Sequence, residues 1–161
     1  KMDQLLTLLS ADARLTNAQL AAALSISEEE VAARIADYEE RKIIKGYKAI
    51  VDWDKTERDY VNARIELKVT PQKGMGFEEI AGIIARFDEV ESVSLMSGAY
   101  DLSVTIEGRT MKDVAIFVHE KLAPLESVLS TATHFVLRKY KEHGVVLVDE
   151  KKTSGRMKIT P

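Results

Sequence analysis

The side chains with the most reactive chemistry are too scattered to form a catalytic or metal centre. The three histidines, His119, His134 and His143, fall on an expected helix, an expected strand and the tail. That spacing suits neither a metal site nor a Ser-His-Asp arrangement. Cysteine is absent, which excludes disulfides, thiolate catalysis and cysteine-ligated metals. We therefore expect no enzyme, no metal site and no resident cofactor.

A glycine-containing bend, Ser97-Gly98-Ala99-Tyr100-Asp101, has the chemistry to hold a small polar molecule. Glycine lets a ligand approach the backbone closely and exposes N–H groups that hold a carboxylate. Asp101 offers a carboxylate to an ammonium group, and Thr131 and Thr133 offer hydroxyls. On the residue pattern alone, however, an ordinary hairpin turn between two strands is the better interpretation.

Composition describes a globular protein with a substantial core. The chain has 161 residues, 45% of them apolar and 30% charged, and no apolar run long enough to span a membrane. Its first residues lack the basic-then-apolar pattern of a signal peptide, so we expect a cytoplasmic protein. Net charge is −3, and residues 1–60 hold nine Lys/Arg against twelve Asp/Glu. Neither half therefore looks like a basic clamp for nucleic acid.

Helical spacing dominates the first sixty residues. Leucines 5, 6, 8 and 9 indicate a first helix, Thr16-Asn17-Ala18-Gln19 has the form of a capping box, and Ser27-Glu28-Glu29-Glu30 has the form of a second. Only residues 24–27 separate the last two helices, and so short a connection is typical of a helix-turn-helix. Residues 41–51, with Gly46 among them, show the pattern of a short β-ribbon, which predicts a wing.

Strict alternation replaces the helical spacing after residue 60. Strands are predicted at 61–69, 92–96, 102–106 and 128–137, and helices at 77–87 and 111–122. The order βαββαβ predicts an α+β, ferredoxin-like sheet with both helices on one face. We divide the chain into a winged helix-turn-helix at 1–52, a linker at 53–60, the ferredoxin-like domain at 61–138 and a tail at 139–161.

The uncovered face of this sheet needs either water or a partner. Thr131, Thr133 and Phe135 share one side of the last strand, and a face that mixes apolar and hydroxyl groups suits pairing between two copies. We therefore expect a dimer. In the tail, Val145-Val146-Leu147-Val148 predicts one more strand, at the sheet edge or on the other subunit, and the polar residues from Lys151 onward are expected to fray.

Short motifs through both halves carry a family resemblance. They are Ala13-Arg14-Leu15-Thr16-Asn17, Leu20-Ala21, Val31-Ala32-Ala33-Arg34-Ile35, Glu39-Glu40, Ile43-Ile44-Lys45-Gly46-Tyr47, Ser97-Gly98-Ala99-Tyr100-Asp101-Leu102 and Ser130-Thr131-Ala132-Thr133. Each motif is weak by itself, but their order and spacing are specific. The chain resembles the Lrp/AsnC, or feast/famine, family of transcription regulators.

The resemblance implies a winged reader of double-stranded DNA joined to an effector-binding RAM domain. It also implies a homodimer that assembles further, for example into a tetramer of dimers, and an amino acid lodged between dimers. The DNA-binding candidates are then Arg14, Thr16, Ser27, Glu28, Glu29, Arg34, Lys42, Lys45 and Lys48. The effector-binding candidates are Met96, Ser97, Gly98, Ala99, Tyr100, Asp101, Leu102, Thr131 and Thr133, and three of these (Met96, Ala99 and Leu102) hint at a small or aliphatic amino acid.

The acidic run at residues 28–30 departs from the small, neutral residues that many family members carry there. Carboxylates accept from cytosine N4 in the major groove, or they are solvated and serve only the helix cap and dipole. An ion pair with Glu30, one turn away, competes with a DNA role for Arg34. These observations leave two functions: an amino-acid-responsive transcription regulator, or a ligand-binding and assembly module whose DNA binding has weakened.

Overall fold

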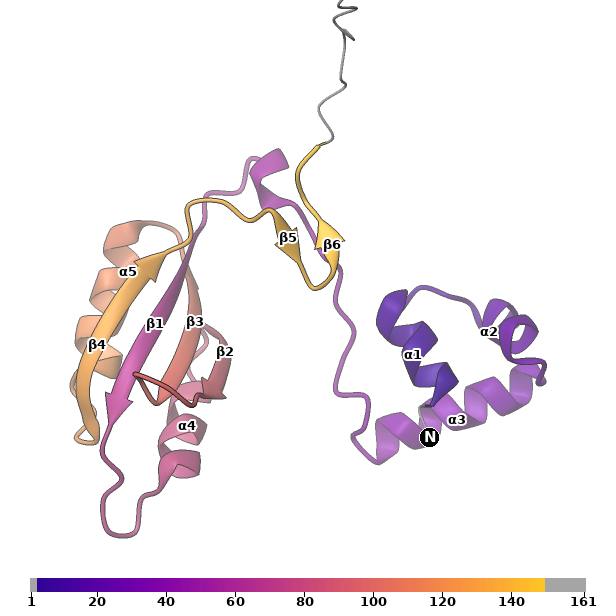
Figure 1. Cartoon of the computed structure of the whole chain (residues 1–161). Helices are drawn as coiled ribbons and strands as arrows, with labels where there is room; N and C mark the ends of the chain where they lie inside the picture. Colours follow the sequence, from indigo (N-terminus) through magenta and orange to yellow (C-terminus); the bar gives the residue numbers. More distant parts are fainter. Residues whose placement is uncertain (1–2, 150–161) are drawn as a thin grey trace, which may run out of the picture. The chain divides into compact units, whose positions relative to one another are not determined.

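The computed structural model describes residues 3–149. The chain divides into two compact units, with the boundary between Val51 and Asp52. Each unit has its own apolar core, so each is described by itself. Figure 1 labels the elements of both.

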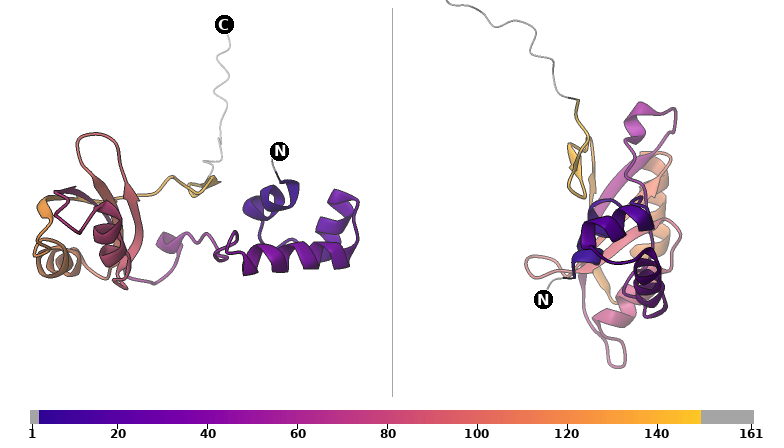
Figure 2. Two further views of the ribbon diagram at one scale, coloured as in Figure 1. Left: turned by 90° about the horizontal axis from the view of Figure 1, so that it is seen from below. Right: turned by 90° about the vertical axis from the view of Figure 1, so that its right-hand side faces the viewer.

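Three short helices form the first unit, as the sequence predicts. They are α1 (Gln4–Ala11), α2 (Asn17–Leu24) and α3 (Glu28–Glu40). Figure 2 shows them from two further sides, packed around one another. Their shared core consists of one apolar stripe from each helix: Leu5, Leu9, Leu20, Ala21, Val31 and Tyr38.

Side-chain caps fix where these helices begin, and one differs from expectation. Thr16 and Gln19 form the complete capping box. Ser27 Oγ accepts from the backbone N–H of Glu30 at 3.1 Å, but no bond returns from Glu30 to Ser27 in the described part of the chain. The second capping box is therefore only half formed, because the Glu30 carboxylate pairs with Arg34 instead.

The predicted wing is absent: residues 41–51 contain no strand. Lys42 takes a left-handed conformation (φ 58°), and the N–H groups of Ile43 and Ile44 both donate to the Tyr38 carbonyl, at 2.8 and 3.1 Å. Ile44 then packs against the helical core. An isolated two-stranded ribbon is marginal in water without a core to pack on. The apolar residues of this segment that would have had to supply one are exposed: Ile43, Tyr47, Ile50 and Val51.

The second unit confirms the predicted βαββαβ order. It begins with one 3-10 turn, η1 (Trp53–Lys55), and continues with β1 (Val61–Val69), α4 (Phe77–Ala85), β2 (Val90–Leu95), β3 (Leu102–Gly108), α5 (Met111–Phe117), a π turn η2 (Val118–Leu122) and β4 (Val128–Phe135). The four strands form one antiparallel sheet in the order β2-β3-β1-β4. Both helices cover the same face of it (Figures 1 and 2).

Strand register decides which side chains face the helices. Ile65 of β1 lies opposite Val104 of β3 and Thr133 of β4, and all three side chains point to the helix-covered face. Thr131 and Phe135 share that side, opposite Leu67 and Ala63. The prediction that these β4 residues form the uncovered face is therefore wrong. The uncovered face is polar instead, with Arg64, Glu66, Lys68, Ser103, Thr105, Ser130 and His134 on it.

The tail forms a small hairpin rather than the single predicted strand. Strands β5 (Lys141–Glu142) and β6 (Val145–Val146) pair with each other, and His143 and Gly144 turn between them with positive φ angles of 45° and 82°. Within residues 3–149 neither strand joins the main sheet. The residues from Lys151 onward lie outside the described range.

Candidate DNA-reading helix and effector bend

The N-terminal end of α3 is exposed and acidic. Ser27 caps the helix, and Glu28 and Glu29 follow it with their side chains in solvent. Neither glutamate forms an ion pair with another residue of 3–149. Helix α3 carries six carboxylates and a single cation, Arg34. The three at its N-terminus, Glu28, Glu29 and Glu30, stabilise the helix through its dipole, and all six repel phosphates.

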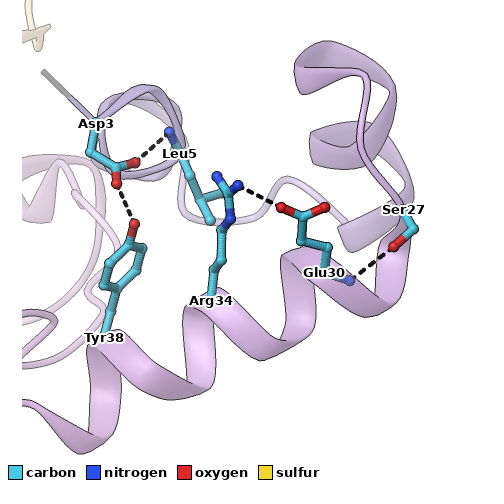
Figure 3. A network of polar contacts seen from close by, with 6 residues as sticks. All are labelled: Asp3, Leu5, Ser27, Glu30, Arg34 and Tyr38. Carbon is cyan, nitrogen blue, oxygen red and sulfur yellow. Dashed lines mark hydrogen bonds and ion pairs between the residues drawn. The ribbon is translucent and has the colours of Figure 1, made fainter. Parts of the chain in front are cut away.

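Arg34 is committed to an ion pair within its own helix. Its Nη2 lies 2.5 Å from Glu30 Oε1, and both side chains are 46% exposed. Figure 3 shows the pair on the side of α3 that faces α1. Together with Asp3, Asp37 and others, Arg34 lines an open groove of about 610 Å³. The ion pair that competes with a DNA role is thus formed.

A second polar contact ties α3 to the start of α1. Tyr38 Oη donates a hydrogen bond to Asp3, whose other carboxylate oxygen caps the N–H groups of Leu5 and Leu6 (Figure 3). The bond from Tyr38 lowers the pKa of Asp3 and raises the pKa of Tyr38. No sequence pattern points to this bond, because the two partners lie 35 residues apart.

Four candidate DNA contacts remain exposed without an ion pair among the described residues: Arg14, Lys42, Lys45 and Lys48. Arg14 lies in the turn before α2, and the three lysines follow α3. The Thr16 hydroxyl is occupied by its cap, where it accepts from Gln19 N–H at 3.1 Å. The structure therefore leaves four cations available for phosphates.

The bend between β2 and β3 presents exposed backbone. Ser97, Gly98 and Ala99 are all exposed, and Gly98 has a φ of +138°, a conformation that side chains rarely adopt. A Cβ at Gly98 would meet nothing within 4 Å, so the space above its backbone is open. Tyr100 is half-buried beside it.

Asp101 has a structural role that the sequence did not reveal. Its Oδ2 accepts from the Val69 N–H at 2.9 Å, and its own N–H donates to the Leu67 carbonyl at 2.9 Å. Both bonds fasten the bend to β1. Within the described residues Oδ1 accepts no hydrogen bond, so one oxygen is left for a ligand.

The other effector candidates are spread over one end of the sheet. Leu67 of β1 lies opposite Thr131 of β4 on one side and opposite Leu102 of β3 on the other. Strand β1 therefore lies between Thr131 and the bend that precedes Leu102. Thr133 lies opposite Ile65, further along β1 from the bend, and both threonines are half-buried on the helix-covered face. Leu102 is fully buried in the core and therefore supports the bend from beneath, whereas Met96 is 40% exposed.

Two family descriptions match the chain, one for each unit. The AsnC-type helix-turn-helix domain matches residues 3–39, and the Lrp/AsnC ligand binding domain matches residues 62–146. The chain belongs to the Lrp/AsnC family. An HTH-type transcriptional regulator of Bacillus subtilis, YugG, is 48% identical over 91% of this chain and 89% of its own length. A proline dehydrogenase transcriptional activator of Rhizobium radiobacter is 25% identical over 88% of this chain and 90% of its own length.

Solved Lrp/AsnC structures share the fold. AsnC of E. coli matches with a TM-score of 0.65 at 20% identity, over 88% of this chain and 96% of its own. A Neisseria meningitidis regulator solved with L-methionine matches with a TM-score of 0.69 at 23% identity, over 88% of this chain and 94% of its own. A feast or famine regulatory protein of M. tuberculosis, also solved with L-methionine, matches with a TM-score of 0.68 at 19% identity, over 86% of this chain and 90% of its own. The family and these named relatives are transcriptional regulators, not enzymes.

In this Lrp/AsnC regulator, no helix of residues 3–149 is long and apolar enough to cross a membrane. The same residues contain no group of three or more His, Asp and Glu side chains arranged to hold a metal ion.

Proposed function

We propose that this chain is an amino-acid-responsive transcription regulator that binds double-stranded DNA in the cytoplasm as a homodimer, which assembles further, for example into a tetramer of dimers. The observation that carries the proposal is the presence of two family domains in one chain, a helix-turn-helix and a ligand-binding sheet. Two relatives were solved with L-methionine, which supports an amino acid as the class of effector.

In the proposed DNA complex, the N-terminal end of α3 enters the major groove and brings Ser27, Glu28 and Glu29 to the base edges. A carboxylate there accepts from cytosine N4. Arg14, Lys42, Lys45 and Lys48 contact phosphates, because these exposed cations lack competing ion pairs in the described structure. Four such cations in each protomer limit a dimer to about eight phosphate contacts, so the slope of log K against log[salt] should be no steeper than about −7. Half-sites should lie about 34 Å apart on one face of the duplex.

The proposed effector site is centred on the bend of residues 97–101. Exposed backbone N–H groups around Gly98 suit the ligand's carboxylate, and the remaining oxygen of Asp101 suits its ammonium group. The exposed Met96 and Ala99 suit a small or aliphatic side chain. The polar uncovered sheet face implies that a dimer interface there uses hydrogen bonds and ion pairs rather than apolar contact.

Mobility-shift titrations test DNA binding directly. The full chain is titrated against its own upstream DNA between about 50 and 200 mM salt. Replacing Lys42, Lys45 and Lys48 together by Ala removes about six phosphate contacts from a dimer, and we expect it to weaken binding at every sequence and to reduce the salt slope by about 5. A matched triple variant in the second unit, at Lys73, Arg109 and Lys112, is the control. Binding without any salt dependence would exclude phosphate contacts and overturn the proposal.

A thermal-shift screen with the twenty amino acids tests the effector class. A ligand that binds only the folded chain raises its apparent stability by RT ln(1 + [L]/Kd), which is about 2.7 kcal/mol at a concentration of 100 Kd. We expect one amino acid, or a few of similar shape, to raise the transition temperature. The absence of any shift up to millimolar concentration would reject an amino acid as effector.

A second function, a ligand-binding and assembly module with weakened DNA binding, is favoured by the three glutamates that open α3. DNA held only at very low salt, together with a clear amino-acid shift, would select this function over the first.

A further inference from the structure

The segment before β1, predicted as a linker at 53–60, is built onto the sheet. One 3-10 turn covers Trp53–Lys55, and Thr56 closes it with bonds from its N–H (3.0 Å) and its hydroxyl (2.8 Å) to the Trp53 carbonyl. The Arg58 guanidinium then lies 4.3 Å from the Trp53 ring centre and 5.8 Å from that of Tyr60. Cations held over aromatic rings in this way are attracted by the ring quadrupole.

Arg58 also pairs with Glu107 at the end of β3. Only 20% of the Glu107 side chain is exposed, against 43% for Arg58. Glu91 of β2 lies beside Glu107 and accepts from the buried Asn62 at 3.1 Å. Because Glu107 is largely withdrawn from water and has a second carboxylate beside it, its charge needs a cation, and Arg58 supplies it. We call Trp53, Arg58, Tyr60 and Glu107 the latch.

The latch shortens the part of the chain that connects the two units without fixed structure. At the other end, Ile44 is held in the helical core and by its bond to the Tyr38 carbonyl. Tyr47 is held as well, because its Oη donates a hydrogen bond to Glu39 of α3 at 3.1 Å. With the latch closed, residues 48–52 span the connection, whereas without it residues 48–60 would. At about 3.5 Å per extended residue, the greatest reach rises from about 18 Å to about 46 Å. That difference approaches the 34 Å of one DNA turn.

We propose that the latch sets the spacing between DNA half-sites that a dimer of this chain accepts. The inference rests on the proposed function, because it needs a dimer that reads two half-sites. A short connection confines both readers and makes binding sensitive to spacing, whereas a long one lets them reach sites at several spacings at a lower effective concentration. Arg58 is thus a positioning residue for specificity that touches no DNA itself.

Selection of random DNA by the full-length chain first supplies the preferred half-site. Duplexes with two such half-sites, separated by zero to twelve base pairs, then measure affinity against spacing. A half-site separation two base pairs away from the optimum should weaken binding by the unsubstituted chain at least about tenfold. The same change should weaken binding by Arg58→Ala less than about threefold. Lys55→Ala is the matched control, because it removes the same charge from the same segment, and within residues 3–149 the Lys55 side chain pairs only with Asp149, at an exposed position.

Hydrogen exchange of the same full-length proteins provides an independent readout of the latch. Arg58→Ala should accelerate exchange of the Thr56 amide at least about fivefold and leave the β1 amides unchanged. A folded Arg58→Ala chain that keeps the original spacing profile would overturn the inference, even if exchange is faster. Glu107→Gln is a second variant that removes the other charge of the same ion pair. It should also widen the range of spacings that the protein binds, and it serves as the test if Arg58→Ala does not fold. Failure of the unsubstituted chain to bind any spacing would instead reject the proposed function, and this inference with it.

Discussion

At the bend before β3, the backbone and the carboxylate of Asp101 both bond to β1. Replacing Asp101 by Ala leaves the Val69 N–H, which is partly buried, without its acceptor. We expect a loss of about 1–2 kcal/mol in the free energy of unfolding, measured by urea titration. Asp101→Asn keeps an acceptor oxygen and removes only the charge, so it should retain most of the stability. An Ala variant as stable as the unsubstituted chain would show that the bond to Val69 contributes nothing.

The same two substitutions separate structure from ligand recognition. If the carboxylate also receives an ammonium group, both variants lose the amino-acid response, but only Asp101→Ala loses stability. The sequence left Asp101 as either a ligand for an ammonium group or part of an ordinary hairpin turn, because a hydrogen bond between residues more than thirty positions apart leaves no local signal.

At the scale of elements, helix α3 neutralises its own cation. Glu30→Gln removes the partner of Arg34, and the released guanidinium becomes available to a phosphate. We expect tighter DNA binding and, with one released Arg34 in each protomer of a dimer, a salt slope steeper by about 2, measured by mobility shift. The double change Glu30→Gln with Arg34→Ala is the control, since it removes both charges. If the gain persists in the double variant, it comes from the lost carboxylate and not from Arg34.

Most elements follow from the sequence because their signals are local. Alternation from Val61 to Val69 located β1, and the Thr16 cap located α2. The predicted wing at residues 41–51 is wrong, because a strand-like pattern alone does not stabilise a β-ribbon. This segment has no core of its own, and Ile44 packs on the helices instead. The face of β4 was misassigned because register decides it, and register became known only from pairing with β1.

At the scale of the whole molecule, two separate cores predict two unfolding transitions. Tyr38→Phe removes the bond to Asp3 and should lower only the transition of the first unit, by about 1 kcal/mol. Val104→Ala, at a fully buried site, should lower only the second, by about 2 kcal/mol. Calorimetry of the full chain measures both. A single transition that moves equally with either change would contradict independent cores.

Acid should erase the effect of Tyr38→Phe. The hydrogen bond from Tyr38 lowers the pKa of Asp3 in the folded chain. Its contribution is therefore present above the unfolded pKa of an aspartate, about 3.9, and disappears as pH falls through the lower folded value. The difference in stability between the two chains should shrink below about pH 4. A difference that stays constant into acid would show that Asp3 does not titrate against this bond.

The acidic opening of α3 also has a consequence for how the regulator finds its target in a genome. Attraction to arbitrary DNA comes almost entirely from cations on phosphates, and a genome offers at least about a million such competing sites. Six carboxylates on one helix weaken that attraction everywhere at once. Fewer copies are then trapped on irrelevant sequence, and the search proceeds by free diffusion between encounters more than by sliding. At a given amount of protein, a larger share is therefore free to encounter its own sites.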